Sequence, residues 1–435
     1  MRTHLLLAGL ALTVAACVSA PVPSRTSTSP GATASATAST MASTMASTFV
    51  PSQPPRVVLI ALDGFRADYL DRPAAVRLRA LAARGVRAER MVPSFPSKTF
   101  PNHYTLVTGL TPAHHGIVAN VMRDSTLGLF RMSDTAAVRN PAWWGGEPIW
   151  VTAERQGRRA AAYFWPGSEA AVGGVRPTWW YPYEHTRPNA VRVARILEWL
   201  AMPPADAPAL IAAYFSDTDD AGHAAGPAAP AVDSAIARVD SAVGAIVDGI
   251  ARLGLTDVVN VVVVADHGMA PVAADRVIVL DELIDLRTVE ILDQNPVAMI
   301  VPRDGDVERV MTAMQGRHPH LAVYRRDAVP SAYRFAGNAR ITPVVAVADD
   351  GWTIATRAEL ARKTSWGGAH GYDPALPSMG AVFVAAGPGV SSGGRTIPAF
   401  RNVHVYGFLA ALIGLRPAPN DGSLDSLRGA LRPLH

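Results

Sequence analysis

Several segments of this sequence place acidic and imidazole side chains directly after apolar runs that are typical of buried strands. The candidate ligands in these segments and in one glycine-rich loop are Asp63, Asp219, His223, Asp266, His267 and His370. In an open α/β sheet the carboxyl ends of the strands meet at one edge, so groups far apart in the chain can converge there. Carboxylates and imidazoles are among the ligands that zinc prefers. The pattern predicts a metal site, although each Asp taken alone also fits a turn or capping role.

A candidate nucleophile, Thr99, lies in the stretch from Phe95 to His103. The two prolines of this stretch bias the residues before them, Phe95 and Phe100, away from the α region, which predicts an extended loop that leads into a helix. The second proline suits the first helical turn. A hydroxyl at such a junction faces unpaired backbone N–H groups and the positive end of the helix dipole, where an anion is stabilised. The alternative is that Thr99 simply caps the helix.

The overall composition is that of an ordinary globular protein. The chain has 435 residues, of which 49% are hydrophobic and 17% are charged, and it is long enough to bury a large core. Its formal net charge is +4, and its sequence pI is about 9.4. The basic residues are scattered rather than grouped, so we associate them with solubility and expect no sequence-specific nucleic-acid binding.

The N-terminus predicts export from the cytoplasm. A basic start precedes an apolar run over residues 5–16, which is too short to span a bilayer and is typical of a secretion signal. The run ends Val14-Ala15-Ala16-Cys17, which resembles a bacterial lipobox, a pattern in which the Cys is lipidated. We expect residues 1–17 to be a lipoprotein signal peptide and Cys17 to anchor the protein in a bacterial membrane, facing the periplasm or the cell surface. A plain signal peptide with an incidental Cys is the alternative.

The next segment, residues 18–54, consists mainly of Ala, Ser, Thr and Pro. Such a composition cannot bury enough apolar surface to fold, so we expect a disordered tether between the membrane and a folded body. Cys17 is the only cysteine of the chain, so the mature domain has no internal disulfide.

The folded body divides into a larger α/β part and an insertion. Strand-like and helix-like segments alternate over residues 55–275 and 346–435, which predicts a mainly parallel sheet sandwiched by helices. Over residues 276–345, short strand candidates surround one helix, and we expect a small α+β cap insertion at the active edge of the sheet. The predicted strands of the larger part are 57–62, 160–165, 209–215, 258–265 and 379–386, and its predicted helices are 74–83, 147–156, 189–200, 231–253 and 403–413.

A set of short motifs occurs in a fixed order along this body. The motifs are Leu62-Asp63-Gly64-Phe65-Arg66, Phe95 to His103, Thr108-Gly109-Leu110, His115-Gly116-Ile117, Asp219-x-x-x-His223-x-x-Gly226-Pro227, Asp266-His267-Gly268-Met269 and Gly368-x-His370-Gly371. Because these motifs occur in this order, the sequence resembles the nucleotide pyrophosphatase/phosphodiesterase (type I phosphodiesterase) family of the alkaline phosphatase superfamily. The resemblance extends over residues 55 to about 415. The resemblance implies an alkaline-phosphatase-like fold and two zinc ions.

The resemblance also assigns the metal ligands. It implies that one zinc, which activates the nucleophile, is bound by Asp63, Thr99, Asp266 and His267. It implies that the second zinc is bound by Asp219, His223 and His370. Asp217 and Asp220 lie close by in the sequence, but the Asp of the family motif lies four residues before the His, which selects Asp219.

Three further residues receive substrate roles from the resemblance. Asn120 matches an Asn that donates to a non-bridging phosphoryl oxygen. Phe100 and Tyr183 match two rings that stack on either side of a nucleobase, and Tyr183 ends a loop, residues 178–183, that resembles the substrate-pocket segment. A core aromatic cluster is the alternative for any ring of this loop.

Together these residues predict a phosphodiesterase. Two metals about 4 Å apart stabilise the attacking and leaving oxygens of an in-line displacement, and Thr99 would form a phosphothreonine intermediate. Three Asp carboxylates and a Thr99 alkoxide balance two zinc ions, so the site suits a phosphodiester monoanion rather than a monoester dianion. We expect hydrolysis of nucleotide diesters and pyrophosphates to nucleoside monophosphates. The alternatives are a choline-headgroup (lyso)phospholipid diesterase, with Trp179, Trp180 and Glu184 around the ammonium group, and a non-catalytic surface binding lipoprotein.

Overall fold

The computed structural model describes residues 53–433. The predicted signal peptide, the lipidation site Cys17 and nearly all of the predicted tether lie outside these residues. No helix within residues 53–433 has the length and hydropathy needed to cross a membrane.

The core of the molecule is an eight-stranded sheet in which seven strands run in one direction. Its strands, in spatial order, are β19 (Arg395–Ile397), β2 (Val86–Ala88), β18 (Phe383–Ala386), β9 (Val259–Val264), β1 (Arg56–Leu62), β8 (Leu210–Phe215), β6 (Ala160–Tyr163) and β7 (Trp179–Tyr181). Only β18 is antiparallel to its neighbours. Every residue of β1 is buried, as expected of a strand covered on both faces. The prediction of a mainly parallel sheet is confirmed.

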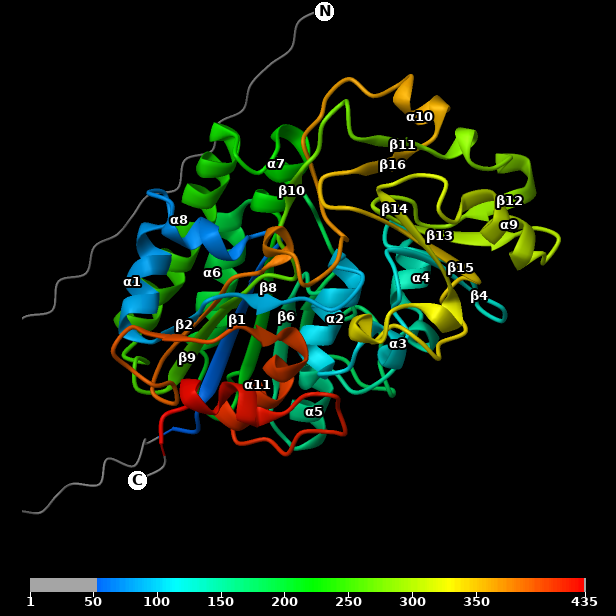
Figure 1. The fold of residues 1–435 in the computed structure, drawn as a ribbon. Helices are drawn as coiled ribbons and strands as arrows, with labels where there is room; N and C mark the ends of the chain where they lie inside the picture. Colours follow the sequence, from blue (N-terminus) through cyan, green and yellow to red (C-terminus); the bar gives the residue numbers. More distant parts are fainter. Residues whose placement is uncertain (1–52, 434–435) are drawn as a thin grey trace, which may run out of the picture. The chain divides into compact units, whose positions relative to one another are not determined.

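Helices cover both faces of this sheet, as predicted (Figure 1). One group contains α1 (Val76–Arg84), α6 (Asn189–Leu200), α7 (Asp217–Ala225) and α8 (Pro230–Arg252), and the other contains α2 (Thr99–Thr108), α5 (Ile149–Arg155) and α11 (Val405–Leu412). The long helix α8 buries one apolar stripe against the sheet and against α1 and α6, which is the pattern of a surface helix. The molecule is therefore a three-layer α/β sandwich.

A second sheet, of four antiparallel strands, lies beside the main one (Figure 1). Its order is β12 (Val289–Ile291), β13 (Val297–Pro302), β15 (Val344–Ala348) and β14 (Leu321–Arg325), and α9 (Val307–Met314) packs on it. β11 (Val277–Val279) pairs in parallel with β16 (Thr353–Ala355), which leads to α10 (Arg357–Leu360). This small region has its own hydrophobic core, and its elements continue past residue 345, where the predicted insertion ended.

The remaining elements are short and lie around the active edge of the main sheet. They are α3 (Pro112–His115), α4 (Thr135–Arg139), β3 (Met91–Val92), β4 (Val121–Asp124), β5 (Gly128–Arg131), β10 (Ala270–Pro271), β17 (Gly368–Ala369) and β20 (Phe400–Arg401).

The start of α2 differs from the sequence prediction. The helix begins at Thr99, with Lys98 as the N-cap residue, so Phe100 is helical and Thr99 is not the cap. Phe100 is therefore helical despite the steric bias of Pro101, and Pro101 itself is tolerated because it lies in the first turn, where a missing N–H costs no helical hydrogen bond. A second difference concerns β18, which begins at Phe383 rather than at Met379, because Met379 ends a 3-10 turn.

Candidate active site

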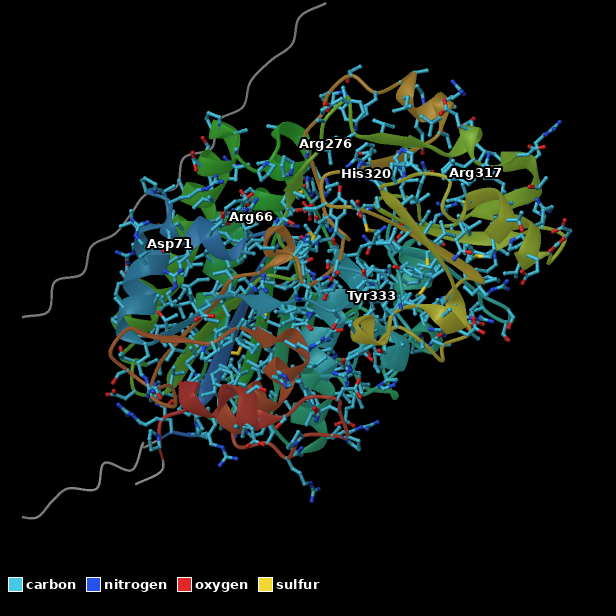
Figure 2. All side chains as sticks on the ribbon, in the orientation of Figure 1. Arg66, Asp71, Arg276, Arg317, His320 and Tyr333 are labelled. Carbon is cyan, nitrogen blue, oxygen red and sulfur yellow. The ribbon has the colours of Figure 1, made fainter. Side chains whose placement is uncertain are left out.

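The acidic segments converge because their strands are neighbours in the sheet. β1 pairs with β8 on one side and with β9 on the other, so the residues after all three strands lie at one edge. Asp63 follows β1 in a turn at Gly64, whose φ of +64° is accessible to glycine at little cost. The Gly64 N–H donates to Asp266 Oδ1 at 3.2 Å. Arg66, labelled in Figure 2, donates to the Met269 carbonyl at 3.0 Å and ties the same two turns together.

In the first group of candidate ligands, Asp63, Asp266 and His267 are buried and Thr99 is half-buried. His267 Nε2 lies 2.9 Å from Asp266 Oδ2 and 3.5 Å from Asp63 Oδ1. Thr99 Oγ1 lies 3.4 Å from His267 Nε2. The structure therefore brings Asp63, Thr99, Asp266 and His267 together at the start of α2.

The second group lies on α7 and on the loop after β17. Asp219 and His223 are one helical turn apart, and Asp219 Oδ1 lies 3.4 Å from His223 Nε2 and 3.7 Å from His370 Nε2. Glycine allows the loop to approach α7, because a Cβ at Gly367 would lie 1.9 Å from the His223 carbonyl oxygen. The rings of His267 and His370 stack with centroids 3.4 Å apart, so the two groups adjoin.

Backbone carbonyls fix the orientation of all three imidazoles. Nδ1 of His223 lies 3.0 Å from the Gly368 oxygen, Nδ1 of His267 lies 2.9 Å from the Gly268 oxygen, and Nδ1 of His370 lies 2.9 Å from the Ser97 oxygen. A carbonyl oxygen can only accept a hydrogen bond, so each Nδ1 carries a hydrogen. Each Nε2 then presents its lone pair on the side of the carboxylates. This is the usual arrangement of metal-binding histidines.

The three carboxylates lack the partners that burial demands. Asp63 Oδ1, Asp219 Oδ1 and Asp266 Oδ2 are buried and accept no hydrogen bond from any residue that the structure describes. Burial, reinforced by the charges of Asp266 and Asp219, raises the pKa of Asp63, and burial also raises that of Asp219. Burial acts in the same direction on Asp266, but His267 and His103 outweigh it and hold the pKa of Asp266 well below its usual range.

These observations fit a metal centre. Buried carboxylates without partners require a positive charge nearby, and three imidazole Nε2 atoms complete a donor set of the kind that zinc uses. Within residues 53–433, the groups of three whose ligand atoms lie within 4.8 Å of one another are Asp219, His223, His370; Asp63, Asp219, His267; and Asp63, His103, Asp266. The residues present can therefore hold metal ions on both sides of Asp219.

Two supporting residues were not identified from the sequence. The Tyr214 hydroxyl donates to Asp63 Oδ2 at 2.5 Å, and it comes from the interior of the predicted strand, where no pattern distinguishes it from a core residue. His103 Nδ1 lies 3.3 Å from Asp266 Oδ2 and 2.9 Å from the Thr99 carbonyl oxygen. His103 is the last residue of the Phe95 to His103 motif, and that position was the only signal in the sequence for a role at this site.

Three of the candidate ligands, Asp63, Thr99 and Asp219, line a cavity of about 670 Å³. Asp63, Thr99, Phe100, Tyr183 and Asp219 all contribute to its wall. Its other lining residues come mainly from the segments around α4, the turn after β6 and the start of α7, and they are Met132, Ser133, Thr135, Val138, Arg139, Phe164, Trp165, Pro166, Gly167, Glu169, Pro182, His185, Tyr214, Ser216 and Asp220. The volume is in the range of small-molecule sites.

Of the three predicted substrate residues, Phe100 and Tyr183 line this cavity, whereas Asn120 is not among its described lining residues and contacts Phe100. Phe100 follows Thr99 on α2, and its N–H donates to Asn120 Oδ1 at 3.0 Å, so the Asn120 amide nitrogen remains available as a donor. The Tyr183 ring packs edge-on against Phe164 with centroids 5.5 Å apart, and its hydroxyl lies 2.9 Å from His185 Nδ1. Tyr183 is 47% exposed, so about half of its side-chain surface is accessible to a ligand.

The segment before Tyr183 is not the loop that the sequence suggested. Trp179 and Trp180 belong to β7, which pairs with β6 at the edge of the main sheet because aromatic residues are good strand formers. Arg176 lies over the Trp180 ring at 5.2 Å, and the Glu184 carboxylate pairs with Arg187. Trp179, Trp180 and Glu184 are not among the described residues that line the cavity. The structure gives no support to a choline-binding cage built from them.

Sequence comparison identifies the family. The model of the type I phosphodiesterase / nucleotide pyrophosphatase family matches residues 57–373. The chain belongs to this family. It is 37% identical over 382 residues to an uncharacterised pyrophosphatase/phosphodiesterase of Schizosaccharomyces pombe, covering 85% of this chain and 79% of that protein. It is also 37% identical over 382 residues to the bis(5'-adenosyl)-triphosphatase of Xenopus laevis, covering 87% of this chain and 82% of the relative.

Longer relatives and a solved structure agree with this assignment. Mouse ectonucleotide pyrophosphatase/phosphodiesterase family member 3 is 36% identical over 389 residues, which cover 87% of this chain but 44% of that protein. An inactive form of mouse ectonucleotide pyrophosphatase/phosphodiesterase 5, solved in complex with AMP, superimposes with a TM-score of 0.83 at 35% identity, covering 87% of this chain and all of that one. The alkaline-phosphatase-like fold is confirmed, and the family membership makes this protein a nucleotide pyrophosphatase/phosphodiesterase that hydrolyses phosphodiester bonds.

Proposed function

We propose that this protein is a zinc-dependent hydrolase that cleaves phosphodiester and pyrophosphate bonds of nucleotides and releases nucleoside monophosphates through a phosphothreonine intermediate. One observation carries the proposal. The hydroxyl of Thr99 lies among buried, unpartnered carboxylates and oriented imidazoles, at the wall of a cavity that also presents Phe100 and Tyr183. Two zinc ions held by Asp63, Asp266 and His267 and by Asp219, His223 and His370 would supply Lewis-acid stabilisation of the phosphoryl oxygens.

The residues of the chain supply the nucleophile and its positioning. Thr99 Oγ1 loses its proton and forms a bond to phosphorus, while the bond from phosphorus to the leaving oxygen breaks. Water then attacks the phosphothreonine, releases the monophosphate and returns a proton to Thr99. The Asn120 amide nitrogen donates to a non-bridging oxygen in both steps, since its own oxygen is held by the Phe100 N–H. Phe100 and Tyr183 bind the base between them.

The charge of the site supports a diester substrate. Asp63, Asp219 and Asp266 with an ionised Thr99 bring four negative charges against the four positive charges of two divalent ions. A dianionic monoester would require an additional cation, such as an Arg fork. Arg139 lines the cavity, but its Nε lies 2.9 Å from Glu169 Oε2, so a carboxylate already neutralises it.

A substrate panel tests the proposal. The zinc-loaded enzyme should hydrolyse a nitrophenyl nucleotide diester faster than nitrophenyl phosphate by orders of magnitude, and faster than nitrophenyl phosphorylcholine. Thr99→Ala should abolish the reaction. Equal rates on the monoester, or a preference for the choline ester, would contradict the nucleotide diester assignment, and an inert wild-type enzyme would favour a binding protein.

We also propose that the protein is an exported lipoprotein anchored through Cys17 and extended from the membrane by residues 18–54. The proposal rests on the lipobox-like end of the apolar run at residues 5–16. Mass spectrometry of the membrane fraction should find a diacylated N-terminal Cys17, and Cys17→Ser should move the enzyme into the soluble fraction. Membrane retention of the Cys17→Ser variant would contradict this assignment.

A further inference from the structure

An ion pair between Lys98 and Asp293 lies beside the candidate nucleophile and has no role in the reaction described above. Lys98 Nζ lies 2.5 Å from Asp293 Oδ1, and the two side chains are 5% and 13% exposed. Burial at this level requires that each charge have its counter-charge. Lys98 is the N-cap residue of α2, whereas Asp293 lies between β12 and β13 in the small region. The pair therefore joins the small region to the residue next to Thr99.

The second oxygen of Asp293 extends this connection to the other side of the site. Asp293 Oδ2 accepts a hydrogen bond from the Asn120 N–H at 3.3 Å. The side chain of Asn120 in turn accepts from the Phe100 N–H at 3.0 Å. Lys98, Asp293, Asn120 and Phe100 thus form a chain of polar contacts that begins at the residue before Thr99 and ends at the residue after it.

Asp293 is itself held in place by its neighbours. The Met299 N–H donates to the Asp293 carbonyl oxygen at 2.7 Å, and the Gln294 N–H donates to Asp293 Oδ1 at 3.0 Å. Both carboxylate oxygens are therefore used, one by Lys98 and Gln294 and the other by Asn120. These hydrogen bonds fix the orientation of the Asp293 carboxylate, and the fixed carboxylate in turn restrains Lys98 and Asn120.

We propose that Asp293 is a positioning residue for catalysis, which acts through Lys98 on the backbone that carries Thr99 and through the Asn120 N–H on the amide that binds the phosphoryl oxygen. This inference rests on the proposed function of Thr99 and Asn120. It makes the small region part of the catalytic unit. A displacement of about 1 Å at a reacting group can cost roughly 100-fold in rate. We therefore expect the loss of Asp293 to lower kcat.

The test is a kinetic comparison of Asp293→Asn with the wild-type enzyme, both zinc-loaded, on a nitrophenyl nucleotide. The Asn side chain has the same shape, but it leaves the Lys98 charge buried without a partner. We expect kcat to fall by about 100-fold and KM to change by less than about threefold. In an Asn120→Ala background the same substitution should lower kcat by a smaller factor than in the wild-type background, because only the path through Lys98 remains.

A double variant guards against a simple loss of folding. Lys98→Met with Asp293→Asn leaves no unpaired charge, so its melting temperature should exceed that of Asp293→Asn alone, while its kcat should remain well below that of the wild type. The matched control is Asp285→Asn, which removes an exposed ion pair with Arg287 in the same region and should leave kcat unchanged. A crystal structure of Asp293→Asn should show the Asn120 amide displaced.

The outcomes separate this inference from the proposed function. If the wild-type enzyme hydrolyses the diester and either Asp293→Asn or the double variant keeps wild-type kcat, the positioning role is wrong and the proposed function stands. The same conclusion follows if kcat falls while Asn120 and the backbone of Thr99 both stay in place. If the wild-type enzyme does not hydrolyse the diester and Thr99→Ala changes nothing, the proposed function is rejected, and the positioning role with it.

Discussion

Thr99 is the residue on which the proposed chemistry depends, and its substitution gives the most direct test. Thr99→Ala removes the hydroxyl without disturbing the buried carboxylates, so we expect activity to fall by more than about 10³-fold with no loss of bound metal. Thr99→Ser keeps a hydroxyl on the same helical turn and should retain measurable activity. Rates on a nitrophenyl nucleotide and metal content measured on the same samples check both statements, and an active Thr99→Ala enzyme would rule out the covalent intermediate.

Tyr214 offers a second test at the scale of single residues. Its hydroxyl donates to Asp63 Oδ2, so Tyr214→Phe leaves a further buried carboxylate oxygen without a partner. Loss of a group that supports a metal ligand typically costs 10–100-fold in affinity or activity. We expect kcat/KM and zinc affinity to fall within roughly that range, as measured by kinetics and competition with a chelator. Tyr324→Phe on β14 is the control, and equal behaviour of the two variants would contradict the role of Tyr214.

The residue scale also shows where reading the sequence succeeds. The ordered motifs named the side chains that the structure brings together, from Asp63 to His370. The roles of Tyr214 and Asp293 could not be predicted from the sequence, for different reasons. Tyr214 sits in an apolar run whose other members are core residues, and Asp293 lies far from every motif, so only the fold shows that it contacts Lys98.

Helix α7 is the element that presents one half of the site, and it was not predicted. Its first turn holds three acidic residues, Asp217, Asp219 and Asp220, which is a typical helix-start signal. On a helix these residues point in different directions. Asp219 faces His223 and His370, whereas Asp217 faces α8 and its Oδ1 lies 2.9 Å from Arg238 Nε. The helical geometry is therefore what distinguishes the candidate ligand from its neighbours.

This difference between two acidic residues on one helix gives a paired prediction. Asp219→Asn should lose at least one zinc equivalent and more than about 10³-fold in activity, because Asp219 adjoins both groups of ligands. Asp217→Asn should keep both ions and near-normal kcat, and weakening of the pair with Arg238 should cost at most about 1 kcal/mol of stability. Metal analysis, kinetics and thermal unfolding of both variants decide the matter. The reverse result would mean that Asp217, and not Asp219, is the metal ligand.

At the scale of elements, the alternation of strands and helices predicted the main sheet well, because strands buried on both faces are continuous apolar runs. Errors occurred where local bias and tertiary packing disagree. The Trp179–Tyr181 segment is an edge strand rather than a loop, and α2 begins two residues before the proline that was expected to start it. The predicted border of the small region, residue 345, falls within β15, and the following β16 and α10 have no sequence pattern that assigns them to one part or the other.

The whole molecule should depend on its metal for stability. Asp63, Asp219 and Asp266 each have one buried carboxylate oxygen that accepts no hydrogen bond within residues 53–433, and a bound cation would offset the cost of burying these oxygens. A ligand that binds only the folded state adds about 4 kcal/mol at 1,000 times its dissociation constant, so removal of zinc by a chelator should lower the melting temperature by roughly 5 °C or more. Calorimetry with and without added zinc measures this, and an unchanged melting temperature would argue against a metal centre.

The two halves of the site differ sharply in their contact with solvent. The side chains of Asp63, Asp266 and His267 are at most 1% exposed, whereas His223 is 45% exposed and Asp219 15%. An ion beside Thr99 would be held by the more buried ligands, whereas one on α7 would have an exposed ligand in His223. Chelation of the loaded enzyme should consequently proceed in two kinetic phases, and the fast phase should vanish in His223→Ala. When zinc becomes scarce, the enzyme would then lose the ion on α7 before it loses the ion beside Thr99.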